Sequence, residues 1–497
     1  MRRLDLRIGR WLGAALILAS AATGRAADSG AHDSGAVAEG RGLFEREFAP
    51  GKTAEGGDGL GPVFNHHSCV ACHALGGTGG AGPVDVNAVT LTADLADRQR
   101  TATHKGLTTV LKEIHAGFVS ERDVITPNIL LHRFGTGDEY AAKREKLGGT
   151  EFPLEPTPQD RTRLQHDLAR LPLKEIKWPR LVKLQLSQRN TTALFGAGAI
   201  DQIPAAALEA LAAAQSQKGE ISGRVPPVGL AKVGRFGWRG QIERLHDFVI
   251  GACSNELGLE VPGSPQPTDP MRPRYRPGGF DLTAAQCVSL TSYVASLAQP
   301  KFDLPTEPER RALVLQGRSL FDVVGCAACH VERIGPVEGL YSDLLLHDMG
   351  QPLADPVPAE ASLEVIRERP LPKGATEPVA TMRSENLPLR PRGYNGGSSM
   401  ANLLRGGSPT LIVINPKTGI RSEFRAVHSN VEQEWRTPPL WGMADSAPYL
   451  HDGRAGTVVD AIALHGGEAD ACTKRFFELP VAERMAVIEF LACLRAP

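Results

Sequence analysis

The residues best suited to chemistry are two copies of the pattern Cys-x-x-Cys-His. The copies are Cys69-Val70-Ala71-Cys72-His73 and Cys326-Ala327-Ala328-Cys329-His330. Two thiols at this spacing can form thioether bonds to the vinyl groups of a haem, and the adjacent histidine then ligates the iron. The alternative is zinc, which requires four ligands, but no second Cys/His pair closely follows either copy. The pattern therefore predicts two covalently bound haem c groups, with His73 and His330 as iron ligands.

Each motif follows a short segment that carries a glycine and a phenylalanine four residues apart, Gly40 and Phe44 in the first case, Gly317 and Phe321 in the second. Each half closes with an amphipathic helical segment, at residues 281–297 and 479–494. This order resembles a cytochrome c domain, seen twice, in which the first and last helices cross at a glycine. We expect a mainly α fold with two cytochrome c-like domains and long loop-rich insertions.

The N-terminus predicts export. Four arginines precede a short apolar run at residues 11–22, and Gly24-Arg25-Ala26 offers small residues for cleavage. We predict a signal peptide at 1–26, an N-terminal domain at 36–300 and a C-terminal domain at 301–497, with a periplasmic location. An uncleaved anchor is the alternative. Further helices are expected at 161–170 and 205–215, and loops at 262–279 and 350–392.

Composition excludes one class of partner. The 497 residues include 55 Lys and Arg against 56 Asp and Glu, so there is no excess of basic residues to bind a nucleic acid. No apolar stretch beyond the N-terminus approaches the ~18 residues needed to span a membrane. The mature protein is therefore expected to have no stable membrane span.

Four cysteines lie outside the motifs: Cys253, Cys287, Cys472 and Cys493. An even number in an oxidising compartment favours disulfides, and four cysteines allow three pairings. Proximity within each half favours Cys253–Cys287 and Cys472–Cys493. Buried free thiols are the alternative.

Several long segments resemble the bacterial di-haem oxidoreductase family, which is related to di-haem cytochrome c peroxidases and MauG. The segments that carry the resemblance are residues 59–65, 234–238, 342–350, 434–442, 447–455 and 465–469. They extend over nearly the whole mature chain. The resemblance implies an enzyme with two unequal haems, of which the N-terminal one is open to substrate.

The resemblance also implies roles for single residues. His465 stands where related peroxidases have Met and MauG has Tyr, so it is the expected distal ligand of the second haem. A helix cap or a propionate contact is the alternative for His465. In residues 196–204, Asp201 replaces the catalytic Glu of relatives, and Gln202 could assist it; the alternative is that Asp201 caps the helix after Pro204. Trp238 is the expected electron relay between the haems, or else a core residue.

Five further residues are expected near the haems. Arginines pair with carboxylates through strong bidentate hydrogen bonds, so three of them are candidates to hold haem propionates, with surface exposure as the alternative. Two histidines are expected beside the haems without ligating iron. The five are Arg235, Arg436, Arg454, His347 and His451.

The expected function is a peroxidase-like oxidoreductase. Hydrogen peroxide would be reduced at the first haem, with electrons arriving from a small redox protein through the second. The alternatives are a di-haem oxygenase that attacks an organic substrate with dioxygen, and a pure electron carrier. A MauG-like modifier of another protein is weakened by His465. The sequence leaves open the donor, the substrate, the distal ligand of the first haem and the oligomeric state.

Overall fold

The structure is a computed structural model in which most of the chain can be described. The described residues are 33–94, 104–120, 123, 125–126, 128–148, 174–177, 182–218, 221–228, 232–355, 363–370, 380–383, 410–415, 420–426 and 431–497. The predicted signal peptide and the predicted helix at 161–170 lie outside them.

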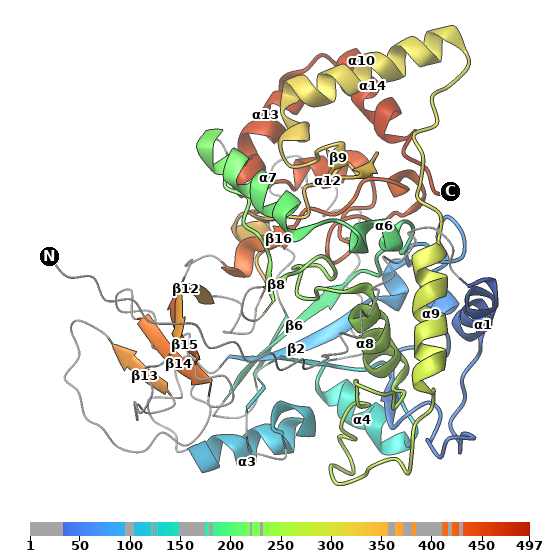
Figure 1. Ribbon diagram of the computed structural model, residues 1–497, viewed down its shortest axis with the longest axis vertical. Coiled ribbons are helices and arrows are strands. Elements are labelled where there is room, and N and C mark those ends of the chain that lie inside the picture. Colours follow the sequence, from blue (N-terminus) through green and yellow to red (C-terminus); the bar gives the residue numbers. More distant parts are fainter. Residues whose placement is uncertain are drawn as a thin grey trace, which may run out of the picture.

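Helices gather at the upper end of the molecule and along its right-hand side (Figure 1). Their bounds are α1 Ser34–Glu45, α2 Cys69–Cys72, α3 His104–Ile114, α4 Asp138–Lys146, α6 Ala197–Asp201, α7 Ala205–Lys218, α8 Leu245–Leu257, α9 Ala284–Ser296, α10 Pro308–Val324, α12 Val458–Ala463, α13 Asp470–Glu478 and α14 Val481–Leu491. Two pairs dominate the packing: α1 against α9 and α10 against α14. These are the first and last helices of the two predicted domains.

A glycine stands at each of these helix crossings. A Cβ at Gly40 of α1 would lie 2.0 Å from the Ser289 carbonyl oxygen of α9, and a Cβ at Gly317 of α10 would lie 1.9 Å from the Ala486 carbonyl oxygen of α14. No side chain fits at such distances, so only glycine allows this close approach. The predicted crossing of terminal helices is therefore confirmed in both halves, although the domain limits themselves stay a prediction.

Local sequence explains where these helices begin and end. Thr283 and Gln286 form a capping box that starts α9, as expected for a helix start near this residue. Pro308 opens α10, where its missing N–H costs nothing. Gly325 ends α10 in the left-handed region with φ of 102°. The second Cys-x-x-Cys-His motif therefore begins directly after a sharp turn.

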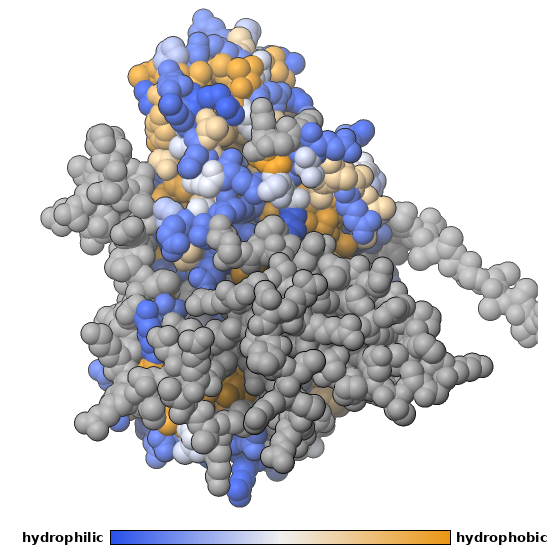
Figure 2. Space-filling view, turned by 90° about the vertical axis from the view of Figure 1, so that its left-hand side faces the viewer, coloured by the Kyte–Doolittle hydropathy of each residue, from blue (hydrophilic) through white to orange (hydrophobic). Residues whose placement is uncertain are grey.

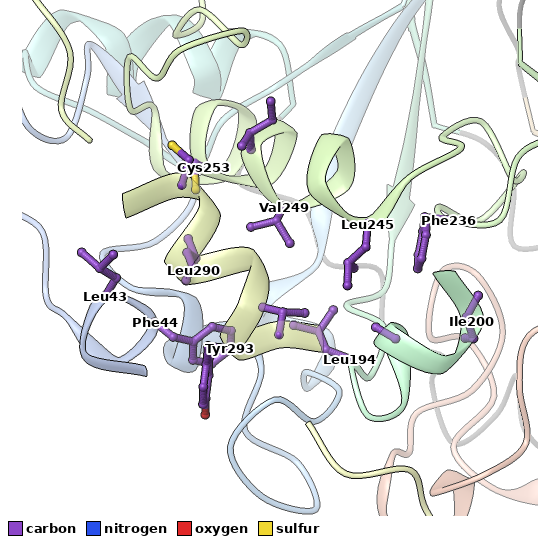
Figure 3. Close-up of a cluster of buried hydrophobic side chains, with 14 of the residues drawn as sticks. Leu43, Phe44, Leu194, Ile200, Phe236, Leu245, Val249, Cys253, Leu290 and Tyr293 are labelled. Atoms are coloured by element: carbon purple, nitrogen blue, oxygen red, sulfur yellow. The ribbon is translucent and has the colours of Figure 1, made fainter. Parts of the chain in front are cut away.

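The largest hydrophobic core joins α1, α6, α8 and α9. Figure 3 shows Leu43 and Phe44 of α1 facing Leu290 and Tyr293 of α9, with Val249 of α8 behind them. A second core lies between α10, α13 and α14 and includes Phe321 and Phe490, whose ring centroids are 5.4 Å apart. Each pair of terminal helices thus has its own apolar core.

The insertions contain more strand than predicted. The strands are β1 Val63–Phe64, β2 Ala88–Asp94, β3 Asn128–Leu130, β4 Phe134–Gly135, β5 Lys174–Lys177, β6 Lys183–Arg189, β7 Pro227–Val228, β8 Lys232–Val233, β9 Arg333–Ile334, β10 Val337–Glu338, β11 Leu346–Asp348, β12 Leu363–Pro370, β13 Ala380–Arg383, β14 Thr410–Asn415, β15 Ile420–Ala426 and β16 Glu434–Arg436. Two antiparallel sheets have four strands each, in the orders β3-β2-β6-β5 and β12-β15-β14-β13.

These sheets correct the expectation of loop-rich insertions. Val89, Leu91 and Ala93 alternate along β2 and are buried with Leu111 and Ile114 of α3. Strict alternation gives a sheet one apolar face, and α3 packs against it. The expected loop at 350–392 is likewise interrupted by β12 and β13. The mainly helical description therefore holds for the ends of the molecule and only in part for the insertions.

Apolar side chains reach the surface at the end of the molecule formed by α10, α13 and α14 (Figure 2). Among them Val323, Val481 and Met485 are exposed. Within the described residues, no helix has both the length and the apolar character needed to cross a bilayer.

Candidate haem-binding centre

The second motif holds His330 with one ring nitrogen free. Its Nδ1 lies 2.9 Å from the Tyr341 carbonyl oxygen, to which it donates a hydrogen bond. Histidines that bind metals usually donate their other ring N–H in this way, which fixes the tautomer and leaves Nε2 as the ligand. Phe321 of α10 packs near the ring, with 6.3 Å between centroids. Phe321, one turn before the end of α10, thus helps to orient the histidine of the motif.

His465 has the same tautomer as His330. It follows α12, and its Nδ1 lies 2.6 Å from the Ala461 carbonyl oxygen. Thr473 of α13 donates a hydrogen bond to the His465 carbonyl at 2.8 Å and holds the backbone. The side chain is therefore fixed from two helices, with Nε2 available.

The two imidazoles face each other at a separation that suits one metal ion between them. The ring centroids of His330 and His465 are 6.4 Å apart, and the ring planes are inclined by 49°. An imidazole nitrogen binds a metal at about 2 Å, so two rings on opposite sides of one ion have centroids about 6 Å apart. Burial lowers the pKa of His330 to about 4 and also lowers that of His465. Both rings are neutral, as metal ligands must be.

A cavity of about 550 Å³ surrounds these histidines. Its wall includes Cys326, His330 and His465 from the C-terminal half, and Trp238 and Phe248 from the N-terminal half. This volume lies within the range for cofactor sites, and the mainly apolar wall suits a porphyrin. The residues of the second motif therefore fit a haem.

Arg436 supplies a buried cation in the wall of the same cavity. Its Nε donates to the Gly237 carbonyl oxygen at 2.8 Å, while its Nη1 has no partner. Burial lowers the pKa of this guanidinium to about 10. An unpartnered buried N–H is costly, and a carboxylate such as a haem propionate would satisfy it.

The other two candidate arginines are engaged within the protein. Arg235 also lines the cavity, but its guanidinium donates to backbone carbonyls, among them Ile203 at 2.7 Å and Val233 at 3.0 Å. Arg454 pairs with Asp452 at 2.5 Å. Both are buried rather than solvated, and their roles toward a propionate stay predictions.

The first motif is built like the second. α2 spans Cys69–Cys72, and His73 Nδ1 lies 3.0 Å from the Gly80 carbonyl oxygen. Burial lowers the pKa of His73 to about 4. Phe44 of α1 packs 6.2 Å from its ring, as Phe321 does for His330. Neighbouring residues Ala81 and Thr192 belong to the wall of the cavity, whereas His73 itself does not.

The proposed distal acid at the first haem has a structural partner. Asp201 Oδ1 accepts a hydrogen bond from the Leu245 backbone N–H at 2.8 Å. It therefore caps the start of α8 and not, as the alternative supposed, the helix after Pro204. Gln202 is exposed, and neither side chain belongs to the wall of the cavity. Their catalytic roles stay predictions.

Trp238 lies in an aromatic cluster at the cavity wall. Its Nε1 donates to the Asn190 carbonyl oxygen at 2.8 Å, and its ring lies edge-on to His451 at 6.5 Å. His451 stacks on Trp435 with 3.6 Å between centroids. All three aromatic side chains line the cavity. His451 lies in the wall of the cavity, its place beside a haem stays a prediction, and Trp435 was not identified from the sequence.

His347 lies between two carboxylates. Its Nε2 is 2.9 Å from Asp343 Oδ2, and its Nδ1 is 2.8 Å from Glu468 Oε2. Burial opposes protonation, but the hydrogen bonds that His347 makes to Asp343, Cys329 and Glu468 raise its pKa to about 12. Cys329, Asp343 and His347 come close enough to hold a metal, but an imidazolium has no lone pair for zinc.

The four remaining cysteines do not pair as proposed. All eight cysteines lie in the described residues, and all are free. Cys472 approaches Cys326, with 3.5 Å between the sulfur atoms, and the favoured Cys472–Cys493 bond is not formed. Cys253 and Cys287 are buried in the core of the N-terminal half as free thiols. That pairing is likewise not formed.

The comparisons with known proteins address the C-terminal half. Residues 418–494 match the family described as "Di-haem oxidoreductase, putative peroxidase". No curated protein matches the chain.

Two solved structures are similar in part. Hydrazine synthase of Kuenenia stuttgartiensis is 17% identical, over 65% of this chain and 74% of that one, with a TM-score of 0.28. A MauG-like protein associated with microbial copper homeostasis is 16% identical, over 55% of this chain and 77% of that one, with a TM-score of 0.24. Such TM-scores are too low to show a common overall fold.

The matched residues include His465, His451 with Trp435 stacked on it, and the closing helix α14. The family description implies two haems, in agreement with the two motifs. The resemblance found in the sequence is therefore confirmed over residues 418–494, which match the model of the di-haem oxidoreductase family.

Proposed function

We propose that the protein is a periplasmic di-haem c-type oxidoreductase that reduces peroxide at its N-terminal haem. The observation that carries the proposal is the pair His330 and His465, whose rings face each other at 6.4 Å. If His330 and His465 both held its iron, the second haem would offer no position to substrate. It would then serve to pass electrons, and the first haem would be the place of reaction.

The residues of the second site have separate tasks. Cys326 and Cys329 would form the thioether bonds, and His330 and His465 would hold the iron. The buried guanidinium of Arg436 would pair with a propionate. The bound haem supplies one-electron chemistry, and the protein supplies its ligands and the charge around it.

At the first site, Cys69 and Cys72 would form the thioether bonds and His73 would hold the iron. Reduction of peroxide needs a group that takes a proton from one oxygen and returns it to the other. Asp201 is the proposed group, with Gln202 as a hydrogen-bonding neighbour. Trp238 is the proposed electron relay, because it lines the same cavity as His330 and His465.

Three measurements test this proposal. The mass of the denatured chain should include two haems, which tests covalent attachment. Low-temperature electron paramagnetic resonance should report one bis-histidine low-spin haem and a second, different haem. Mixing with hydrogen peroxide and a reduced donor should give turnover. Two six-coordinate haems in every oxidation state, without turnover, would refute the peroxidase assignment.

A pure electron carrier is the second candidate function. The observation that favours it is the engagement of Asp201 as the cap of α8, which leaves one carboxylate oxygen for any role in proton transfer. In this case both haems would be six-coordinate. The turnover experiment separates the two functions, because a carrier would exchange electrons with a donor and leave peroxide intact.

The proposal also includes export to the periplasm and the donation of electrons by a small redox protein. Export is supported by the basic and apolar segments at residues 1–26. Finding the protein only in the cytoplasm, with residues 1–26 still attached, would contradict this location.

A further inference from the structure

A third cysteine lies against the first cysteine of the second motif. Cys472 of α13 has its sulfur 3.5 Å from that of Cys326, and both side chains line the cavity. A disulfide is about 2.05 Å long, so the two sulfur atoms need to approach by roughly 1.5 Å.

The other thiol of the motif faces away from this contact. Cys329 Sγ lies 3.8 Å from His347 Nδ1. Within the described residues, the sulfur contact of Cys326 is therefore with Cys472 and not with its neighbour in the motif. Cys326 begins a short turn directly after Gly325, where the backbone takes a left-handed conformation that presents the side chain to α13.

The surroundings of Cys472 favour its thiolate, which is the reactive form of a cysteine. Arg475 stands one turn later in α13 and donates to the Val324 carbonyl oxygen at 2.7 Å, and its charge acts on the Cys472 thiol. The hydrogen bond with Cys326 lowers the pKa of Cys472, burial opposes this shift, and the charge of Arg475 adds to it. A thiolate next to a cation is the usual nucleophile in disulfide exchange.

We propose that Cys472 and Cys326 form a disulfide in the exported chain before its second haem is attached. The bond masks one of the two thiols that the haem requires, so Cys472 controls when the second motif can be loaded. The control of loading rests on the proposed covalent attachment and export. The disulfide itself rests on the contact between the two sulfur atoms.

The chemistry is thiol–disulfide exchange with a disulfide oxidant of the compartment. The Cys472 thiolate attacks one sulfur of the oxidant, forms a mixed disulfide and releases the first thiolate. The Cys326 thiolate then attacks the Cys472 sulfur and releases the second. Two protein thiols lose two electrons and two protons, and the oxidant becomes two thiols. A dithiol reductant reverses both steps and frees Cys326.

The first test maps disulfides in the full chain, exported without the haem-attachment machinery and alkylated before digestion. We expect a peptide pair joined through Cys326 and Cys472. It should be lost on reduction and lost in Cys472→Ser. The matched control is Cys493→Ser, which removes a buried cysteine of the same core and should leave the linkage intact.

The second test uses the full chain exported with the machinery but with limited dithiol reductant. We expect chains that carry only the first haem to retain the Cys326–Cys472 linkage. Cys472→Ser should increase the share of chains with two haems, whereas Cys493→Ser should not. Free Cys326 and Cys472 in both preparations, or Cys326 joined only to Cys329, would overturn the proposal.

These outcomes remain separate from those of the proposed function. Intact mass after full reduction reports haem attachment, whereas the peptide map reports the disulfide. If the chain has the linkage but no covalent haem, the disulfide is supported and its proposed role in haem loading is refuted. If the chain has two covalent haems and no linkage in either preparation, the disulfide proposal is refuted and the proposed oxidoreductase function is unaffected.

Discussion

The imidazole of His451 stacks on the indole of Trp435, with 3.6 Å between centroids and 10° between planes. The Arg239 guanidinium also lies against the Trp435 ring, 3.9 Å from its centroid. A cation over the ring stabilises the neutral indole and opposes removal of an electron from it. Trp238, which touches His451 edge-on, carries no such cation among the described residues. Of the two, Trp238 is better suited to pass electrons.

We therefore expect Trp238→Phe to slow electron transfer between the haems by at least about tenfold, equivalent to about 1.4 kcal/mol of activation free energy. Trp435→Phe should leave the rate nearly unchanged. Rapid-mixing absorbance measurements on reduced protein with hydrogen peroxide would report both rates. The reverse order of the two variants would contradict the relay assignment.

Replacement of the proposed distal ligand should change the second haem specifically. Thioether ligation raises the potential of a haem relative to imidazole, so His465→Met should raise it by on the order of 100 mV within the roughly 0.8 V that axial ligands cover. A redox titration followed by absorbance measures the shift. His246→Met is the control, since His246 bonds Thr291 between α8 and α9. Equal potentials in wild type and His465→Met would exclude iron ligation by His465.

The glycine at the first helix crossing should tolerate no side chain. Gly40→Ala places a methyl group against the Ser289 carbonyl oxygen and should cost about 1–3 kcal/mol of unfolding free energy. Gly42→Ala in the same helix meets no atom within 4 Å and should stabilise α1 by up to about 1 kcal/mol. Denaturant unfolding followed by circular dichroism compares them. Similar effects of the two substitutions would contradict the tight crossing.

Asp201 can be tested separately as a cap and as a proton-transfer group. Asp201→Ala should cost about 1 kcal/mol, because the N-terminus of α8 loses its acceptor, and Asp201→Asn should keep most of that stability. Asparagine cannot transfer a proton, so the peroxide turnover of Asp201→Asn reports catalysis alone. Turnover equal to wild type would leave Asp201 as a helix cap only.

Sequence patterns predicted the features that local residues encode. The crossing helices follow from a glycine and a helical apolar stripe, and the motif histidines follow from adjacent cysteines. The alternation of Val89, Leu91 and Ala93 was visible in the sequence, and it could have predicted β2. The assignment of His465 needed the family resemblance, because no spacing within the chain links it to His330.

Other features of the site depend on contacts between distant residues. The sulfur atoms of Cys326 and Cys472 meet across 146 positions, and His347 binds Glu468 across 121. Neither pair has a local signal, since the approach is set by how α13 and the loop before it pack on α10. Asp201 likewise caps a helix that begins 44 positions later.

The crossing of α1 and α9 also determines when the N-terminal half can be completed during synthesis of the chain. Ser289 of α9 donates a hydrogen bond to Glu39 of α1 at 2.6 Å across 250 residues. A ribosome adds about 5–20 residues per second, so these 250 residues take on the order of 10–50 s. For most of that interval the first Cys-x-x-Cys-His motif has been made while α9, which packs against α1, has not. The N-terminal half therefore presents an open motif during synthesis, and it can close only when α9 is complete, with 201 of the 497 residues still to be made.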